Sequence, residues 1–126
     1  MYSHTGYQSN DVRDVSLECI QQCLEKKDAP FITKRFVDKE SIELLLTAVN
    51  KAEKMSGFLN YGALFTMTIT LNDGSEEQYH LNISNSEKSQ EGLLVKLSDT
   101  AQGYSIPEET SERLKHFIYK PHARLE

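Results

Sequence analysis

The sequence has no long apolar run and no long basic run, and both absences exclude classes of function. Its longest apolar runs, such as residues 44–46, fall far short of the roughly 18 apolar residues of a membrane-spanning helix. Its basic pairs, at residues 26–27 and 34–35, are diluted by acids, and the formal net charge is -5. Nucleic-acid backbones attract clustered Lys and Arg. We therefore expect no nucleic-acid partner and no transmembrane segment in this chain.

Motifs of catalysis are also missing. The chain contains no Gly-x-Ser-x-Gly, no His-Glu-x-x-His and no glycine-rich phosphate loop. His4 and His122 lie in the terminal segments and His116 lies in a predicted helix, so only His80 lies on a predicted strand. Nucleophilic catalysis needs a nucleophile, a base and an orienting group that converge in one pocket. We predict a non-enzymatic protein without catalytic residues, metal ligands or a cofactor.

Cysteine is scarce, and its two copies are close together in the sequence. Cys19 and Cys23 would lie roughly 13 Å apart on one face of a strand, too far for a disulfide, whereas on a helix they would be adjacent. Two thiols alone lack the remaining ligands of a structural zinc site. We interpret both as buried, unbridged core side chains, which suits a reducing compartment. A thiol-based metal or redox sensor is the weaker alternative.

The length of 126 residues suits a single domain. Residues 1–14 are polar and predict a flexible leader, and residues 15–119 hold the predicted domain, which we expect to be monomeric. Residues 120–126 form a predicted tail, whose final Leu125 and Glu126 are typical of a cloning remnant.

Hydrophobic spacing predicts the secondary structure of the first half. Residues 15–23 have apolar side chains at even spacing, which favours a strand, although a short helix also fits part of them. Residues 31–37 predict a second strand, paired with the first as a hairpin. Asp38 is a good N-cap for a helix over residues 39–55, and Gly57 is a natural residue to end it.

The second half predicts a run of strands and then a helix. Residues 65–83 alternate between apolar and polar side chains around the turn at Asn72, Asp73 and Gly74, which predicts a hairpin. Residues 92–98 predict the next strand. Ser105 and Glu108 have the spacing of a capping box for a final helix, which stops before Pro121.

The resulting order β-β-α-β-β-β-α indicates an α+β fold. We predict a two-layer sandwich of a mostly antiparallel sheet with both helices on one face. The other face then carries a row of polar side chains. Such a face is commonly just solvated, but it is also a plausible docking plane for another protein or a cell-envelope polymer. The candidate binding residues on it are Thr66, Thr68, Gln78, His80 and Asn82.

Several stretches resemble the YhfM-like family, namely residues 36–46, 52–57, 68–74, 79–83 and 104–114. The resemblance covers roughly residues 15–119 and implies a small protein of Gram-positive bacteria, from a family that often carries a lipoprotein signal and has no established activity. It implies a cell-surface address with a lipid anchor in the precursor, against the alternative of a cytoplasmic address. The family often has an aromatic or apolar residue where this chain has Asn82, which weakens the transfer of any surface role.

These observations favour an interaction or accessory domain of unidentified partner, tethered outside the cytoplasm. The alternative is a small ligand-binding protein or enzyme, whose pocket would form between residues 58–63 and the sheet.

Overall fold

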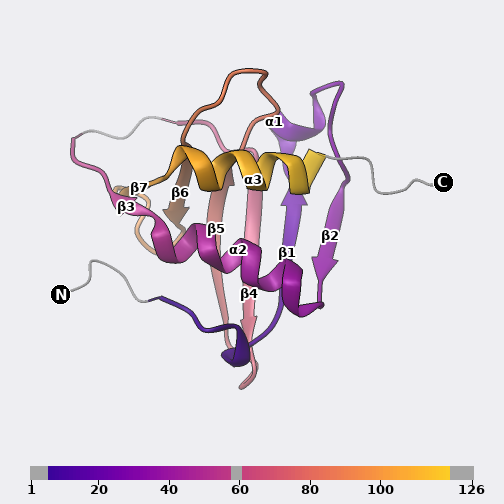
Figure 1. The fold of residues 1–126 in the computed structure, drawn as a ribbon, viewed down its shortest axis with the longest axis vertical. Coiled ribbons are helices and arrows are strands. Elements are labelled where there is room, and N and C mark those ends of the chain that lie inside the picture. Colours follow the sequence, from indigo (N-terminus) through magenta and orange to yellow (C-terminus); the bar gives the residue numbers. More distant parts are fainter. Residues whose placement is uncertain (1–5, 58–60, 120–126) are drawn as a thin grey trace.

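A seven-stranded antiparallel sheet organises the protein (Figure 1). The computed structural model describes residues 6–57 and 61–119. The strand order is β2-β1-β4-β5-β6-β7-β3. The strands are β1 (Val12–Cys19), β2 (Thr33–Phe36), β3 (Glu53–Lys54), β4 (Phe65–Leu71), β5 (Glu76–Asn82), β6 (Gly92–Lys96) and β7 (Gly103–Ile106).

Two long helices, α2 (Lys39–Lys51) and α3 (Glu108–Tyr119), lie side by side on one face of the sheet (Figure 1). Two short elements complete the fold, the 3-10 turn η1 (Ser9–Asp11) and the single-turn helix α1 (Gln21–Leu24). The predicted α+β class, with both helices on one face of an antiparallel sheet, is confirmed.

The core fills the space between these helices and the sheet. Each helix buries one stripe, because its apolar residues recur every three or four positions. Each strand buries alternate residues, because successive side chains point to opposite faces. The side chains that meet there include Leu45 and Val49 of α2, Leu114 and Ile118 of α3, and Val15, Leu17, Phe65, Met67, Ile69 and Leu81 of the sheet.

The folded domain begins earlier than the sequence predicts. Strand β1 starts at Val12, and Tyr7 is already fixed against α2. The backbone N–H of Tyr7 donates to Asn50 Oδ1 at 2.7 Å, and Asn50 Nδ2 donates to the Tyr7 carbonyl at 2.8 Å. Strand β1 and Tyr7 therefore fall in part within residues 1–14, the segment predicted as a leader. Residues 1–5 and 120–126, which hold the rest of the predicted leader and the predicted tail, lie outside the described residues.

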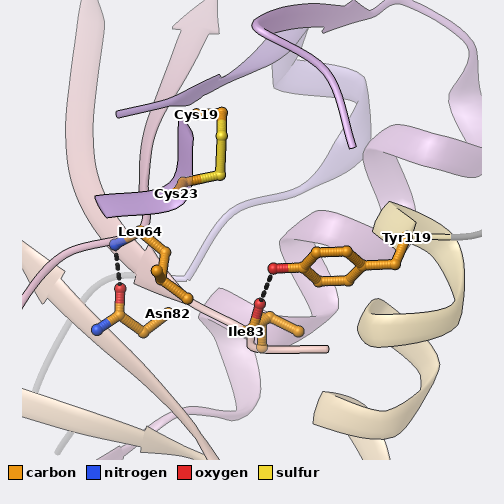
Figure 2. The surroundings of a disulfide bond; sticks show 6 residues. All are labelled: Cys19, Cys23, Leu64, Asn82, Ile83 and Tyr119. Atoms are coloured by element: carbon orange, nitrogen blue, oxygen red, sulfur yellow. Dashed lines mark hydrogen bonds between the residues drawn. A yellow bond between two sulfur atoms is a disulfide. The ribbon is translucent and has the colours of Figure 1, made fainter. Parts of the chain in front are cut away.

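The first predicted strand is divided in the structure. Strand β1 ends at Cys19, and the chain turns at once into α1, so Cys23 folds back beside it. The two Cα atoms lie 5.3 Å apart and the sulfurs form a disulfide (Figure 2). The prediction of unbridged thiols is wrong, because it assumed one secondary structure for both residues. Their predicted burial is confirmed, since each is 1% exposed.

Strand β3 shortens the first long helix. The predicted helix over residues 39–55 ends at Lys51, because Ala52 is extended and the next two residues pair with β7. Ser105 is therefore part of a strand, and its hydroxyl donates to the Glu91 carboxylate at 2.7 Å instead of capping α3. The first bond of α3 runs from Ser111 N–H to the Pro107 carbonyl. The predicted capping box is wrong.

Candidate functional site

The surface of the sheet opposite α2 and α3 is the outer face. Residues that face each other across an antiparallel pair point to the same side. The register places Thr66 opposite His80 and Thr68 opposite Gln78, while Asn82 continues the same side of β5. The structure therefore brings all five predicted binding residues together on the outer face, across two adjacent strands.

Three of the five residues form the more open part of the row, which we call the bare half: Thr66, Thr68 and Gln78. Gln78 is exposed and the two threonines are half-buried. Gln78 Nε2 donates to Thr68 Oγ1 at 3.1 Å, which aligns the two side chains across the strands. On the other side of β4, Ser16 of β1 lies opposite Thr68 and extends the row of hydroxyls. The bare half is thus an array of hydroxyl and amide groups.

The row does not extend to Thr70, which is only 5% exposed. Thr70 lies opposite Asp14, where the ladder of β1 and β4 is irregular. Asp14 is itself buried, and its carboxylate is 3.0 Å from Arg35 Nη2 and 3.6 Å from Arg13 Nε. Two cations compensate the buried charge. This corner of the outer face is therefore closed by an ion-paired cluster.

The other half of the row is covered, and we call it the covered half: His80 and Asn82. The Tyr61 hydroxyl lies 2.9 Å from His80 Nδ1, and the two rings meet edge to face with centroids 5.8 Å apart. Burial lowers the pKa of His80 and raises the pKa of Tyr61. Residues 61–64, which lie over the outer face just before β4, are called the crossing chain. His80 thus binds the crossing chain rather than acting as a free base.

Asn82 fixes the same crossing chain by its backbone. Its Oδ1 accepts from Leu64 N–H at 2.7 Å (Figure 2), and its Nδ2 donates to the Gly62 carbonyl. One amide therefore satisfies both a donor and an acceptor of the segment that enters β4. Asparagine is depleted in strands, so its presence in this alternating run was a signal of a specific hydrogen-bonding role. Sequence reasoning named Asn82 but missed Tyr61, Gly62 and Leu64.

A groove of about 520 Å³ opens beside the covered half. The crossing chain forms one wall and the connection between β5 and β6 forms the other. The second wall is held by hydrogen bonds, since Gln90 Nε2 donates to Ser84 Oγ at 2.7 Å and Ser105 Oγ donates to Glu91. Its lining mixes apolar, amide, hydroxyl and carboxylate side chains, and comprises Met55, Gly62, Leu64, Asn82, Ser84, Gln90, Glu91, Gly92, Leu93 and Ser105.

This groove lies where the alternative prediction expected a pocket, between residues 58–63 and the sheet. Gly62 is part of its lining, whereas residues 58–60 lie outside the described part of the chain. The groove has one carboxylate, from Glu91, and its described lining contains no Lys or Arg. Its charge therefore favours neutral or hydrogen-bond-donating groups over anions.

The disulfide supports this end of the outer face from below. Ile20, which follows Cys19, donates its backbone N–H to the Leu64 carbonyl at 3.0 Å. Figure 2 shows the disulfide, Leu64 and Asn82 close together, with Tyr119 of α3 on the far side donating its hydroxyl to the Ile83 carbonyl at 2.7 Å. Burial of that hydroxyl raises the pKa of Tyr119. The wall of the groove at Leu64 is therefore hydrogen-bonded to Ile20, whose neighbour Cys19 is held by the disulfide.

A second polar cluster lies away from the outer face, where the N-terminal segment meets the sheet. The Tyr7 hydroxyl donates to the Glu77 carboxylate and is 2.7 Å from the Tyr79 hydroxyl. Lys96 Nζ is 3.3 Å from the same carboxylate. Burial raises the pKa of Tyr79 to about 12. This cluster fastens residues 6–11 to the domain, and no sequence pattern predicted it.

Two further features are absent from residues 6–57 and 61–119. No group of three or more His, Cys, Asp or Glu side chains there is arranged to hold a metal ion. None of the helices in that part of the chain is both long and apolar enough to cross a membrane.

Comparison with known proteins decides the family. Residues 14–122 match the family described as YhfM protein. The chain belongs to the YhfM family. The match spans the whole sheet from the middle of β1, both long helices and every residue of the bare and covered halves. No curated protein and no solved structure matches the chain. The role of this YhfM protein's outer face must therefore be argued from its own geometry.

Proposed function

We propose that this YhfM-family protein is a non-enzymatic binding module that works outside the cytoplasm and binds a neutral cell-envelope glycan on its outer face. The observation that carries the proposal is the bare half, an array of hydroxyl and amide groups on Thr66, Thr68 and Gln78. Sugar hydroxyls can exchange hydrogen bonds with such an array at a small desolvation cost, because its groups are still solvated in the free protein.

The composition of this surface favours a glycan over a protein partner. Protein interfaces concentrate their energy in buried aromatic and apolar anchors surrounded by a polar rim. The bare half offers hydroxyls and an amide instead, and the apolar Leu64 and Leu93 occur only in the adjoining groove. A formal net charge of -5 opposes a polyanion. A neutral polysaccharide that lies across the bare half meets both conditions.

The disulfide between Cys19 and Cys23 supports an address outside the cytoplasm. Disulfides persist in oxidising compartments and are rare where cellular thiols are kept reduced. The bridge also removes the conflict between the cysteines and a lipoprotein address, which we propose as the form of attachment. Both sulfurs are bonded and buried, which supports a structural role over a nucleophilic one.

Titration with a soluble neutral glycan tests the proposal. With a β-linked tetramer of N-acetylglucosamine as the probe, we expect saturable amide shifts at Thr66, Thr68 and Gln78. The double variant Thr68→Val, Gln78→Ala should bind at least about tenfold more weakly, which corresponds to roughly 1.4 kcal/mol. Thr100→Val, which alters an exposed threonine in the turn before β7, should bind like the wild type. Unchanged affinity of the double variant would contradict the proposal.

A second candidate function is small-ligand binding in the groove alone. Its volume of about 520 Å³ lies within the range of known ligand sites, and its mixed lining suits a compact neutral molecule. Shifts confined to residues 61–64 and 82–93, insensitive to the double variant but abolished by the groove-filling change Leu93→Trp, would favour this candidate. Turnover of the bound molecule would then identify an enzyme.

A further inference from the structure

The strand β2 forms an edge of the sheet, and its backbone is half unpaired. Cys19 donates its N–H to the Ile32 carbonyl, and the register places Lys34 opposite Leu17. Backbone groups of alternate residues point to opposite edges of a strand. Ile32 and Lys34 therefore point theirs toward β1, whereas Thr33 and Arg35 point theirs away. No other strand of the described sheet pairs with that side of β2.

Two exposed apolar side chains flank this edge. Ile32 immediately precedes β2 and is 72% exposed, and Val37 immediately follows it and is 59% exposed. They are the two most exposed large apolar side chains in the described part of the chain. An unpaired edge presents a template for an added strand, whose main chain supplies hydrogen bonds while its alternate side chains supply specificity.

The centre of the edge is cationic. Lys34 and Arg35 are neighbours on β2, so their side chains lie on opposite faces of the sheet. Arg35 pairs with Asp14 at 3.0 Å, yet its side chain is still 62% exposed. Lys34 Nζ lies 5.6 Å from the centroid of the Phe36 ring. An added strand would therefore meet a positive charge on each of its two faces.

These charges oppose a second copy of the chain as the added strand. In an antiparallel pair of two β2 edges, residues with outward backbone groups must face each other, so Thr33 and Arg35 can face only odd-numbered residues of the copy. One register places Arg35 opposite itself, and the other central register places Lys34 opposite itself. Like charges directly opposite each other destabilise a strand pair. The edge thus disfavours self-pairing in these two central registers.

We propose that the β2 edge binds an extended acidic peptide segment of a partner protein, which joins the sheet as an antiparallel strand. The register defines the segment it fits. Two adjacent acidic residues lie opposite Arg35 and Lys34, and apolar residues lie two positions before and two positions after that pair, opposite Val37 and Ile32. The pattern is apolar-x-acid-acid-x-apolar. This site is separate from the outer face and does not depend on the glycan proposal.

A blocked hexapeptide, Val-Thr-Glu-Glu-Thr-Val, is the probe, and the same peptide with two lysines in place of the glutamates is its control. We expect the acidic peptide to shift the amides of Thr33 and Arg35, to slow their hydrogen exchange, and to bind more weakly as salt rises. The lysine peptide should bind at least about tenfold more weakly, because its charges oppose those of the edge. Equal binding of the two peptides would overturn the proposal.

A proline at position 33 tests the backbone pairing directly. Thr33→Pro removes an N–H that faces the free edge while the bonds to β1 remain. We expect it to reduce affinity for the acidic peptide at least about tenfold, whereas Thr33→Val should keep wild-type affinity. Undiminished binding by the proline variant would exclude strand addition.

The charge-reversed variant Lys34→Glu gives a test that does not depend on how well the proline variant folds. We expect it to lose affinity for the acidic peptide and to gain affinity for the lysine peptide. If the variant still bound the acidic peptide more tightly than the lysine peptide, the proposal would be contradicted. Slow exchange of the Thr33 and Arg35 amides before any peptide is added would also contradict it. Such protection indicates a second copy if it depends on protein concentration, and closure by the chain itself if it does not.

Discussion

Gln78 and Asn82 lie on the same strand and the same face, four residues apart, yet their amides have different partners. The Gln78 side chain is exposed and donates a hydrogen bond to Thr68, whereas the Asn82 side chain binds the backbone of Leu64 and Gly62. The same alternation in sequence placed both on the outer face. The comparison shows that a face can be predicted from a pattern, while the availability of each side chain depends on what crosses it.

The difference comes from the path of the chain between β3 and β4. Strand β3 lies at one edge of the sheet and β4 lies near the other, with β7, β6 and β5 between them. The end of this connection, residues 61–64, is bound to the outer face of β5. It contacts the outer face at His80 and Asn82, and leaves Thr68 and Gln78 uncovered.

The largest expected effect concerns the disulfide, which lies next to Ile20, the backbone partner of Leu64 at the covered half. We expect the double variant Cys19→Ala, Cys23→Ala to lower the free energy of unfolding by about 2 kcal/mol, because the bridge restricts a short loop of the unfolded chain. Urea denaturation measures this change. Wild-type protein reduced with dithiothreitol should lose a similar amount, and equal stability of oxidised and reduced protein would refute the assigned role.

The next expected effect compares the two amides directly. Asn82→Ala leaves the Leu64 N–H without its partner, so we expect a loss of about 1–2 kcal/mol. Gln78→Ala removes an exposed amide and should cost no more than about 0.5 kcal/mol. Asn82→Asp keeps the acceptor and loses the donor, so it should fall between them. Equal costs in urea denaturation would remove the distinction between the two halves.

A pH dependence should follow from His80. Burial lowers its pKa in the folded protein, so the unfolded chain takes up a proton first, near pH 6.5. Stability should therefore be greatest above that pH and fall as the pH drops from about 6.5 to the folded pKa. His80→Gln should remove this component in thermal unfolding measured from pH 8 to pH 5. His116→Gln, which changes an exposed histidine of α3, should retain it.

The smallest expected effects belong to polar exchanges in the bare half. Thr66→Ser and Gln78→Thr should each change the free energy of unfolding by no more than about 0.5 kcal/mol, because neither residue anchors another part of the chain in the structure described here. Paired urea denaturation curves give the measurement. A loss above 1 kcal/mol from either exchange would show that the bare half has a structural role too.

Much of the fold could be read from the sequence because local spacing reports local structure. The apolar stripes predicted both long helices, and the alternation around Asn72–Gly74 predicted the β4–β5 hairpin, in which Gly74 has the expected positive φ of 92°. Hairpin connections then required an antiparallel sheet. The five candidate residues shared a face for the same reason, since the period of a strand is two.

Tertiary structure alone decided the features that depend on distant residues. The first long helix ended early because Glu53 and Lys54 pair with β7, about fifty residues later in the chain. Cys19 and Cys23 met because α1 folds back after β1, which periodicity could not distinguish from a continuous strand. His80 and Asn82 are hydrogen-bonded to the chain that enters β4. Strand β2 is an edge because no strand lies beyond it in the described sheet. Sequence spacing fixes which side of an element a residue occupies, whereas its partners are set by how the whole chain passes over that side.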